Sequence, residues 1–456
     1  MPRIVNSSLH GNDVIFPTSY RLQEILLTNH QGRQTDISRL VTDFSITESI
    51  YLPSLVLELN IKDPLNLIEE FQLSGQERIQ VKISKKPHEA TDETEKTVTK
   101  EFYVTEYPVY GKYPNRLQVY TLKGISEHAF LSKFKKISRA YSGNIKDFVF
   151  DVLTRDLSFD GNNIKISDRS SGSAAFIVPN LAPLDAIAWA LRRAFDSGGS
   201  PWYCYESLYD GIRIASQGEM VQKDPYYTYQ EILTLSADPL TKQDYDQRRS
   251  MIASIASDLK MSKYIAGANG AFGATTEYID IHTKKRTKRN FVYSSEFNNM
   301  EWTNSQGINL SPSFEVNGEN LDTYNSARVT YLPINSKSYD DYRNYHSTTL
   351  DGQLDRANSY VQNLDNLVHD LTVAGDFDLN AGNTVNIKLF KSIDPQLTIQ
   401  NAEESDDAET NKWDDALSGK YLVTSVVHKF AEEYESEMRI KRDSGSPLVQ
   451  WSDTIQ

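Results

Sequence analysis

The segment Gly382-Asn-Thr-Val-Asn-Ile-Lys-Leu389 places apolar side chains at every second position, which is the period of a β-strand with one buried face. Two more strand-like segments follow it, Tyr421-Leu-Val-Thr424 and Tyr434–Ser444, and a short turn at Ala431–Glu433 precedes the last of them. Strands joined by short turns are typical of an antiparallel meander. This part of the chain is therefore predicted to form a β-sheet unit.

The same succession of segments occurs in the N-terminal part. The strand-like segments there are Glu77–Ser84, in which Ile79, Val81 and Ile83 alternate, then Glu101–Tyr110 and Arg116–Ser126. In both parts a long polar segment (Lys85–Lys100 and Glu403–Asp415) separates the first strand from a strand with an aromatic residue close to Val-Thr. Repeated periods indicate repeated structural units, so we predict an internal duplication. Two unrelated meanders that share a common pattern are the alternative.

Three segments have the apolar spacing of helices that cover a β core. They are Asn144–Leu157, Leu184–Phe195 with Pro183 in its first turn, and Asp351–His369. The region between the second and third of these helices contains strand-like runs at Trp202–Tyr205 and Ile212–Ala215, a hairpin of Tyr278–Ile281 with Asn290–Tyr293, and a loop over Asn298–Ser326. The predicted fold class is mainly β with α+β parts.

Composition excludes several classes of function. The chain has 456 residues and a net charge of −14, which argues against a dedicated duplex-binding protein and against attachment to anionic lipid by charge. Its single cysteine, Cys204, excludes an internal disulfide and a thiolate metal cluster. The longest apolar runs are far too short to span a membrane, so no membrane anchor is expected.

No catalytic or cofactor motif stands out. Gly267–Gly273 is spaced G-x-x-G-x-x-G, which differs from the phosphate-binding fingerprint and favours a flexible loop. His88-Glu89 lacks the second histidine of a zinc site, and Cys204 lies in an aromatic run that favours packing. The acidic run Glu403–Asp415 lacks the glycine turn of a calcium loop, so we interpret it as a solvated loop. We predict no catalytic, cofactor-binding or metal-binding residues.

The sharpest charged feature is a basic cluster inside this acidic protein. Its five cations lie within six residues: Lys284, Lys285, Arg286, Lys288 and Arg289. The simplest interpretation is an exposed hairpin turn whose charges keep a sheet edge soluble. Binding of a partner protein is the second interpretation, and binding of nucleic acid is the third.

Several segments, in a fixed order, resemble one protein family. The most telling runs are Val373–Ile387, Ser418–Phe430 and Tyr434–Asp443; the others are Tyr120–Ser126, Arg139–Gly143, Pro179–Trp189 and Gly270–Gly273 with Tyr278–Ile281. Together they resemble the tail-hub superfamily of contractile phages and related injection machines. This superfamily includes the baseplate hub of T-even-type phages, late-control D proteins and the hub part of type VI secretion spikes.

The resemblance implies two tail-tube-like β-barrel domains with inserted mixed α/β regions. The expected limits are residues 1–130 (first barrel), 131–240 (mixed connecting domain), 241–350 (middle region), 351–445 (second barrel) and 446–456 (C-terminal tail). Three chains with two similar barrels each would present six similar units, which adapt a sixfold tail tube to a threefold central spike.

The resemblance also implies partners and contact sites. The expected partners are two more copies of the chain, the tail tube protein, the central spike protein, other baseplate proteins, and tape-measure protein or DNA in the lumen. Because tube subunits in this family join through sheet edges, the candidate interface residues are Ile79, Val81, Lys82, Ile83, Val385, Ile387 and Lys388. The family carries no catalytic residues, and the expected location is the virion tail baseplate after assembly in the host cytoplasm.

Two alternatives stay open. The chain could be the hub of a phage-derived contractile injection or secretion system, which neighbouring toxin or effector genes would indicate. It could also be a tail-associated carbohydrate-active enzyme, which would need two facing carboxylates in an open cleft.

Overall fold

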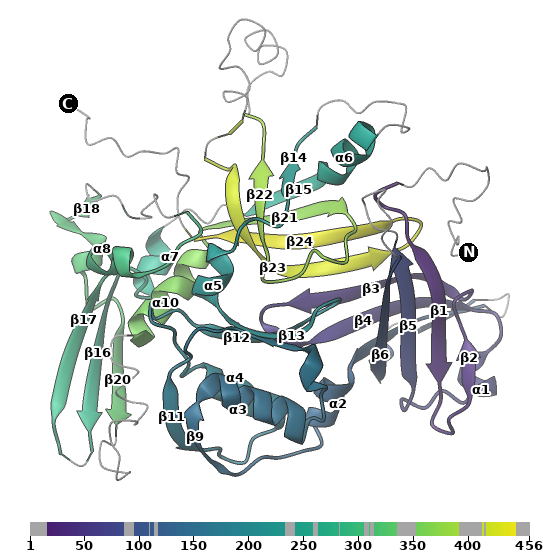
Figure 1. The fold of residues 1–456 in the computed structure, drawn as a ribbon, viewed down its shortest axis with the longest axis horizontal. Helices are drawn as coiled ribbons and strands as arrows, with labels where there is room; N and C mark the ends of the chain where they lie inside the picture. Colours follow the sequence, from purple (N-terminus) through teal and green to yellow (C-terminus); the bar gives the residue numbers. More distant parts are fainter. Residues whose placement is uncertain are drawn as a thin grey trace, which may run out of the picture.

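The computed structural model describes residues 16–443, apart from 86–94, 109, 114–116, 233–241, 259–262, 282, 305–309, 311–313, 335–352, 392–412 and 415. The predicted fold class is confirmed: the chain is mainly β, with helices inserted between large antiparallel sheets. A 14-stranded sheet crosses the molecule, and smaller sheets and helices lie beside it (Figure 1).

The N-terminal meander begins with β1 and ends with β8. Its elements are β1 (Arg21–Thr28), β2 (Gln34–Asp36), β3 (Val41–Ser49), β4 (Leu52–Asp63), α1 (Leu67–Glu70), β5 (Arg78–Lys85), β6 (Lys96–Glu106), β7 (Tyr110–Lys112) and β8 (Gln118–Ser126). The alternation in β5 buries Ile79, Val81 and Ile83, as the sequence predicts. The polar segment before β6 is shorter than expected because β6 already begins at Lys96 and pairs with Lys85.

The C-terminal meander contains β21 (Leu367–Ala374), β22 (Thr384–Lys388), β23 (Gly419–Phe430) and β24 (Tyr434–Arg442). Two strands from earlier in the chain join it. β14 (Thr228–Gln230) pairs with β22, and β15 (Ile252–Asp258) pairs with β21. The strands at residues 228–258 therefore belong to the same sheet as the second meander, although the sequence assigned them to the inserted regions.

The two meanders have the same order of strands. In the first, neighbouring strands run β1-β5-β6-β8-β4-β3; in the second, they run β14-β22-β23-β24-β21-β15. Ranked by position along the chain, the strands of both sets lie in the order first, fourth, fifth, sixth, third, second. The four central strands of each set are antiparallel to one another. One pair differs in direction, because β1 is antiparallel to β5 whereas β14 is parallel to β22. The shared order is what an internal duplication produces.

The connecting region packs helices against short strands. Its elements are α2 (Glu127–Ser132), β9 (Ala140–Asn144), α3 (Ile145–Asp151), a π-helical turn (Val152–Asp156), a 3₁₀ turn (Gly161–Asn163), β10 (Ile164–Ile166), β11 (Ser173–Ile177), α4 (Pro183–Leu191), β12 (Trp202–Ser207), β13 (Gly211–Ser216) and α5 (Gln217–Gln222). The predicted helix Asn144–Leu157 corresponds to α3 with its π-helical turn, and Pro183 occupies the first turn of α4 as expected.

The middle region carries a separate three-stranded sheet at one end of the molecule (Figure 1). Its elements are α6 (Lys242–Ser250), α7 (Lys263–Ala268), β16 (Gly273–Asp280), β17 (Arg286–Val292), α8 (Tyr293–Glu296), a 3₁₀ turn (Phe297–Asn299), β18 (Glu315–Val316), β19 (Glu319–Asn320), a 3₁₀ turn (Leu321–Thr323) and β20 (Val329–Ile334). The predicted loop at Asn298–Ser326 thus contains a small hairpin, β18 with β19.

The helix before the second meander is shorter than predicted. α10 (Gln353–Leu364) ends at Leu364 instead of His369, and β21 begins at Leu367. Leu367 and Val368 continue the apolar rhythm of the helix, but they pair with β24. Sheet pairing thus overrides the local helical pattern at this point.

Candidate functional site at the junction of the two meanders

The two meanders are joined along a seam between β3 and β23. Residues 425–430 of β23 pair antiparallel with residues 44–49 of β3. The rings of Phe44 and Phe430 stack with centroids 4.7 Å apart, and Tyr434 stacks on the other side of Phe430 at 4.4 Å. All three rings are buried, so the seam is a continuous hydrophobic core shared by both units.

A buried carboxylate on β3 ties three parts of the chain together. Glu48 accepts a hydrogen bond from the backbone N–H of Ala381 at 2.5 Å and another from the N–H of Leu208 at 2.6 Å. Ala381 precedes β22, and Leu208 lies in the turn between β12 and β13. Burial raises the pKa of Glu48 to about 8, although the two backbone donors lower it. The carboxyl is therefore mostly protonated at neutral pH.

His428 of β23 faces Glu48 across the seam. Its Nε2 atom lies 4.0 Å from Oε2 of Glu48, and its Nδ1 atom is 2.8 Å from the hydroxyl of Tyr434. Burial lowers the pKa of His428 to about 3, so the imidazole is neutral at pH 7. Nε2 has no hydrogen-bond partner among the described residues. Two neutral groups, instead of an ion pair, occupy the centre of the junction.

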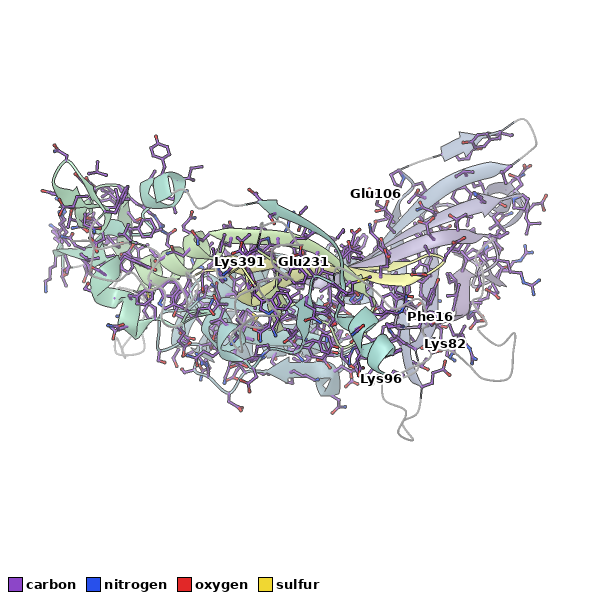
Figure 2. All side chains as sticks on the ribbon, turned by 90° about the horizontal axis from the view of Figure 1, so that it is seen from above. Phe16, Lys82, Lys96, Glu106, Glu231 and Lys391 are labelled. Carbon is purple, nitrogen blue, oxygen red and sulfur yellow. The ribbon has the colours of Figure 1, made fainter. Side chains whose placement is uncertain are left out.

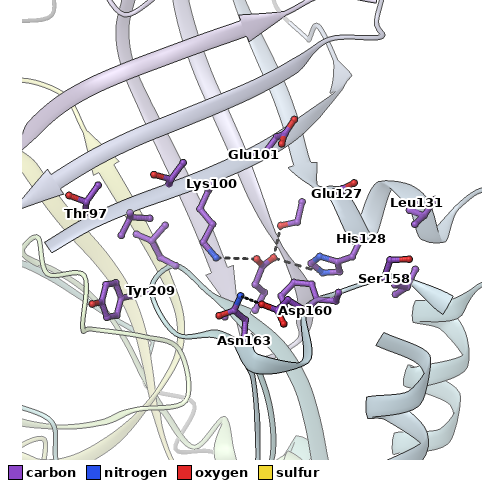
Figure 3. A pocket seen from close by; sticks show the side chains of 18 residues that line it. Thr97, Lys100, Glu101, Glu127, His128, Leu131, Ser158, Asp160, Asn163 and Tyr209 are labelled. Carbon is purple, nitrogen blue, oxygen red and sulfur yellow. Dashed lines mark hydrogen bonds and ion pairs between the residues drawn. The ribbon is translucent and has the colours of Figure 1, made fainter. Parts of the chain in front are cut away.

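A second buried carboxylate, on the β12–β13 hairpin itself, bonds back to the first meander. Glu206, near the end of β12, accepts a hydrogen bond from the N–H of Leu55 in β4 at 3.0 Å and one from the hydroxyl of Ser126. Lys100 places its Nζ atom 3.3 Å from the same carboxylate, and Nε2 of His128 lies 3.9 Å away (Figure 3). The β12–β13 hairpin is thus held on one side by Glu48 and on the other by its own Glu206.

A buried lysine makes a third contact between segments that are distant along the chain. Lys85, at the end of β5, donates from Nζ to the carbonyl of Pro17 at 2.6 Å and to the carbonyl of Gly375, which follows β21. Burial lowers the pKa of Lys85 to about 8. Nearby, Lys96 and Asp378 form an ion pair at 2.6 Å between β6 and the second unit. Lys85 and Lys96 are directly paired across β5 and β6, so these contacts fix the two meanders relative to each other near the Phe430 end of the seam.

A cleft of about 590 Å³ lies beside Glu206 (Figure 3). Its lining includes the acidic side chains of Glu101, Glu127 and Asp160 together with Lys100 and His128. The buried carboxylate, Glu206, already accepts hydrogen bonds from the N–H of Leu55 and from the hydroxyl of Ser126. These bonds give it a structural role, which is to hold the β12–β13 hairpin on the first meander. Within the described ranges, no group of three or more His, Cys, Asp or Glu residues is placed to hold a metal ion.

The remaining sequence candidates for chemistry are packed or outside the described residues. Cys204 is buried in β12, and burial raises the pKa of its thiol to about 12, which agrees with the predicted packing role. His88-Glu89 and most of the acidic run Glu403–Asp415 lie outside the described residues. No helix in the described part of the chain has the length and apolar character needed to cross a membrane.

The candidate interface residues divide into two groups. Ile79, Val81, Ile83, Val385 and Ile387 are at most 1% exposed and form part of the cores within the chain. β5 and β22 also have a paired strand on each side, so neither is a free sheet edge. The five apolar residues therefore cannot offer a contact surface, which corrects that part of the prediction.

Only the two lysines of the set reach the surface. Lys82 is partly exposed and lies with Phe16 and Lys96 at the same end of the molecule (Figure 2). Lys388 is exposed, with Nζ 5.6 Å from the ring centroid of Trp413. Buried and exposed positions alternate along both strands, so the lysines and the apolar residues point to opposite faces.

The basic cluster lies partly in a strand, not wholly in a turn. Lys284 and Lys285 precede β17, whereas Arg286, Lys288 and Arg289 lie within it. Within the described residues, β17 pairs with β16 only and is an edge strand of the three-stranded sheet. The expectation of an exposed hairpin turn is therefore correct for the first two residues and wrong for the last three.

The junction residues were missed from the sequence because their partners are distant along the chain. Glu48, Leu208 and Ala381 are separated by more than 150 residues. One signal was present: Glu48 follows Phe44 and Ile46 at alternate positions, where an apolar residue is expected on the buried face. A carboxylate at such a position indicates a buried polar contact.

Comparison with solved structures identifies the fold. The tail protein from Neisseria meningitidis MC58 is 10% identical, with a TM-score of 0.51, and the match covers 93% of this chain and 97% of that chain. The chain has the fold of that tail protein. No family model and no curated protein sequence matches it.

Two further solved structures are similar over most of the chain. The 43 kDa tail protein of prophage MuSo2 from Shewanella oneidensis is 10% identical, with a TM-score of 0.45 and coverage of 92% of this chain and 98% of that one. The E. coli c3393 protein, a component of the type VI secretion system, is 9% identical, with a TM-score of 0.40 and coverage of 93% and 77%.

Proposed function

We propose that this chain is the structural hub of a contractile phage-tail baseplate. The observation that carries the proposal is the repeated strand order of the two meanders in one chain. Three such chains would present six similar sheet units, enough to meet a sixfold tube on one side while keeping the threefold symmetry of a spike on the other. The fold of the Neisseria meningitidis tail protein supports the same role.

The buried junction suits a part that has to keep its shape when force acts on it. Glu48 accepts a hydrogen bond from the N–H of Ala381, and Lys85 donates to the carbonyl of Gly375, so relative motion of the two meanders would break buried hydrogen bonds. In this proposal the partners are the tube protein, the central spike and other baseplate proteins, and the lumen passes tape-measure protein or DNA. The location is the virion baseplate, after assembly in the host cytoplasm, and no catalysis is assigned to the chain.

Contacts between copies would use free edges and exposed charges. Among the described residues, β2 and β15 end the path of the large sheet, and six of the seven residues of β15 are exposed or partly exposed. Lys82 and Lys388 remain candidate contacts on the outer faces. If they contribute, the charge reversals Lys82→Glu and Lys388→Glu will weaken ring assembly without changing the fold.

Electron microscopy with class averaging tests the proposal, using the purified chain alone and mixed with its spike protein. Threefold rings with six lobes are the expected result. Persistent monomers in the presence of the spike would contradict the hub role, and cleavage of a glycan substrate would then favour the enzyme alternative.

A further inference from the structure

The three-stranded sheet at the end of the molecule has a free edge. Its order is β17-β16-β20, so the outer edge of β17 has no strand beside it in the described part of the chain. Unpaired N–H and C=O groups on such an edge can accept another extended segment as an added strand. β17 has seven residues, which is long enough for several backbone hydrogen bonds.

The cations along this edge differ in their contacts. Arg286 forms an ion pair with Glu277 of β16, and Arg289 is partly buried on the face of the sheet that packs towards α10. Lys284, Lys285 and Lys288 are exposed, and no carboxylate pairs with any of them among the described residues. Three lysines are therefore free to meet negative charge beside an open strand edge.

The opposite face of the sheet, which carries Arg286 and Lys288, also exposes apolar side chains. Ile279 of β16 is 39% exposed, and Tyr331 of β20 is 60% exposed. The strand register places both on the face that carries Arg286 and Lys288. An edge of this kind, with cations and apolar groups side by side, is better suited to a peptide than to solvent alone.

The chain itself contains a complementary segment. Glu403–Glu409 has seven residues, the length of β17, and five of them are acidic. Side chains on adjacent strands lie about 5 Å apart when directly opposite, so alternate acids can each meet a cation. Nucleic acid fits less well, because it has no peptide groups for the strand edge and meets a protein of net charge −14.

We propose that the outer edge of β17 binds the acidic segment Glu403–Glu409 of a neighbouring copy as an added strand. This inference rests on the proposed function in one respect, namely that several copies lie side by side. It gives the basic cluster a partner and explains how one acidic chain carries both a concentrated positive and a concentrated negative segment.

The test measures binding of a fluorescent peptide with the sequence of residues 400–415. The acceptor is the full chain with its own acidic segment neutralised (Glu403→Gln, Glu404→Gln, Asp406→Asn, Asp407→Asn, Glu409→Gln), so that the edge is free. Fluorescence anisotropy should show saturable binding that weakens as salt rises. Adding Lys284→Gln, Lys285→Gln and Lys288→Gln should weaken it by at least about fivefold, since three exposed ion pairs are lost.

Matched controls keep the result specific. The triple variant Lys62→Gln, Lys133→Gln, Lys136→Gln removes the same charge from exposed lysines elsewhere and should leave binding unchanged. A peptide with N-methylated backbone amides keeps its charge but should lose affinity, because it cannot complete the strand ladder. Equal binding of that peptide, or no binding of the unmodified one, would overturn the proposal.

Assembly of the full chain decides whether the segment comes from a neighbour. Sedimentation should show that the native chain associates at lower concentration than either the lysine variant or the acid-neutralised variant. Unchanged association would overturn the role between copies. Rings that form normally while the peptide fails to bind would contradict this inference alone, whereas the absence of rings with the native chain would contradict the proposed hub function.

Discussion

The two meanders share an order of strands but differ at one edge. In the first, all eight residues of β5, Arg78–Lys85, pair with residues 96–103 of β6. This edge of β6 is therefore covered by β5 over that whole length. In the second, β22 pairs with β23 over only four residues, Thr384–Ile387. Further along the same edge of β23, Ser425–Phe430 pair with β3. Because β22 is short, part of the edge of β23 is available to β3, and this pairing joins the two units.

This difference also decides where polar side chains are buried. The seam carries Glu48 and His428 at its centre, and both are fully buried and neutral. In contrast, β5 pairs with β6 along its whole length, and its alternate side chains Ile79, Val81 and Ile83 are buried in the apolar core. The junction therefore depends on hydrogen bonds that reach across the seam as well as on apolar packing.

The largest effect is expected from truncating the aromatic core of the seam. Phe430→Ala removes a ring that stacks on Phe44 and Tyr434 and should lower the free energy of unfolding by about 3–5 kcal/mol. Urea unfolding followed by tryptophan fluorescence measures the loss. Phe134→Ala, at a ring that is 72% exposed, is the control and should change it by less than about 0.5 kcal/mol. Equal effects of the two would mean that the seam contributes little.

A pair of matched truncations compares the two meanders directly. Ile83 in β5 and Ile387 in β22 are both at most 1% exposed. Changing either to Ala should destabilise the chain by about 2–4 kcal/mol, through lost burial and the cavity that remains. Measured by the same urea titration, a loss confined to one variant would show that the two units are not energetically equivalent.

A pH titration separates the seam from the rest of the fold. The pKa of Glu48 is raised to about 8, so its protonated form is favoured by folding, and the stability it contributes is lost as pH rises through 8. His428, with its pKa lowered to about 3, acts in the opposite direction and only below about pH 6.5. Between pH 6.5 and 8.5 the native chain should lose about 1–3 kcal/mol of stability.

The variant Glu48→Gln assigns that loss. Its uncharged side chain should flatten the pH dependence between pH 6.5 and 8.5, at the cost of one backbone hydrogen bond at every pH. Denaturant midpoints at a series of pH values provide the measurement. An unchanged slope in the variant would show that another group titrates in this range.

The smallest effect is expected at the exposed end of the junction. Lys96 and Asp378 are each about one-third exposed, so Lys96→Met should cost no more than about 1 kcal/mol. The difference from the native chain should disappear in about 1 M salt, because screening removes the attraction. A cost that persists at high salt would point to packing of the lysine stem instead.

Local periodicity predicted much of the β framework and none of the junction. The alternation at Ile79, Val81 and Ile83 and at Val385 and Ile387 identified the buried faces correctly. It did not show that both strands lie inside a sheet, because neighbours such as β1 and β14 come from distant positions. The same limit applies to Glu48, whose two backbone donors come from other units.

Helix and turn limits were the other source of error. The apolar rhythm that forms α10 continues into Leu367 and Val368, so sequence alone extended the helix into β21. In the basic cluster, like charges on adjacent residues favoured a solvated turn. Pairing with β16 nevertheless extends three of these residues into β17, because a strand edge leaves their side chains in water.

In the proposed assembly, the two meanders play equivalent parts in one ring. A high-resolution electron microscopy map of the assembled chain on its tail tube would show this. The second meander of each chain should lie at the same radius and height as the first, so that six similar units contact the tube. A map in which only the first meander contacts the tube, with threefold symmetry throughout, would contradict this assembly.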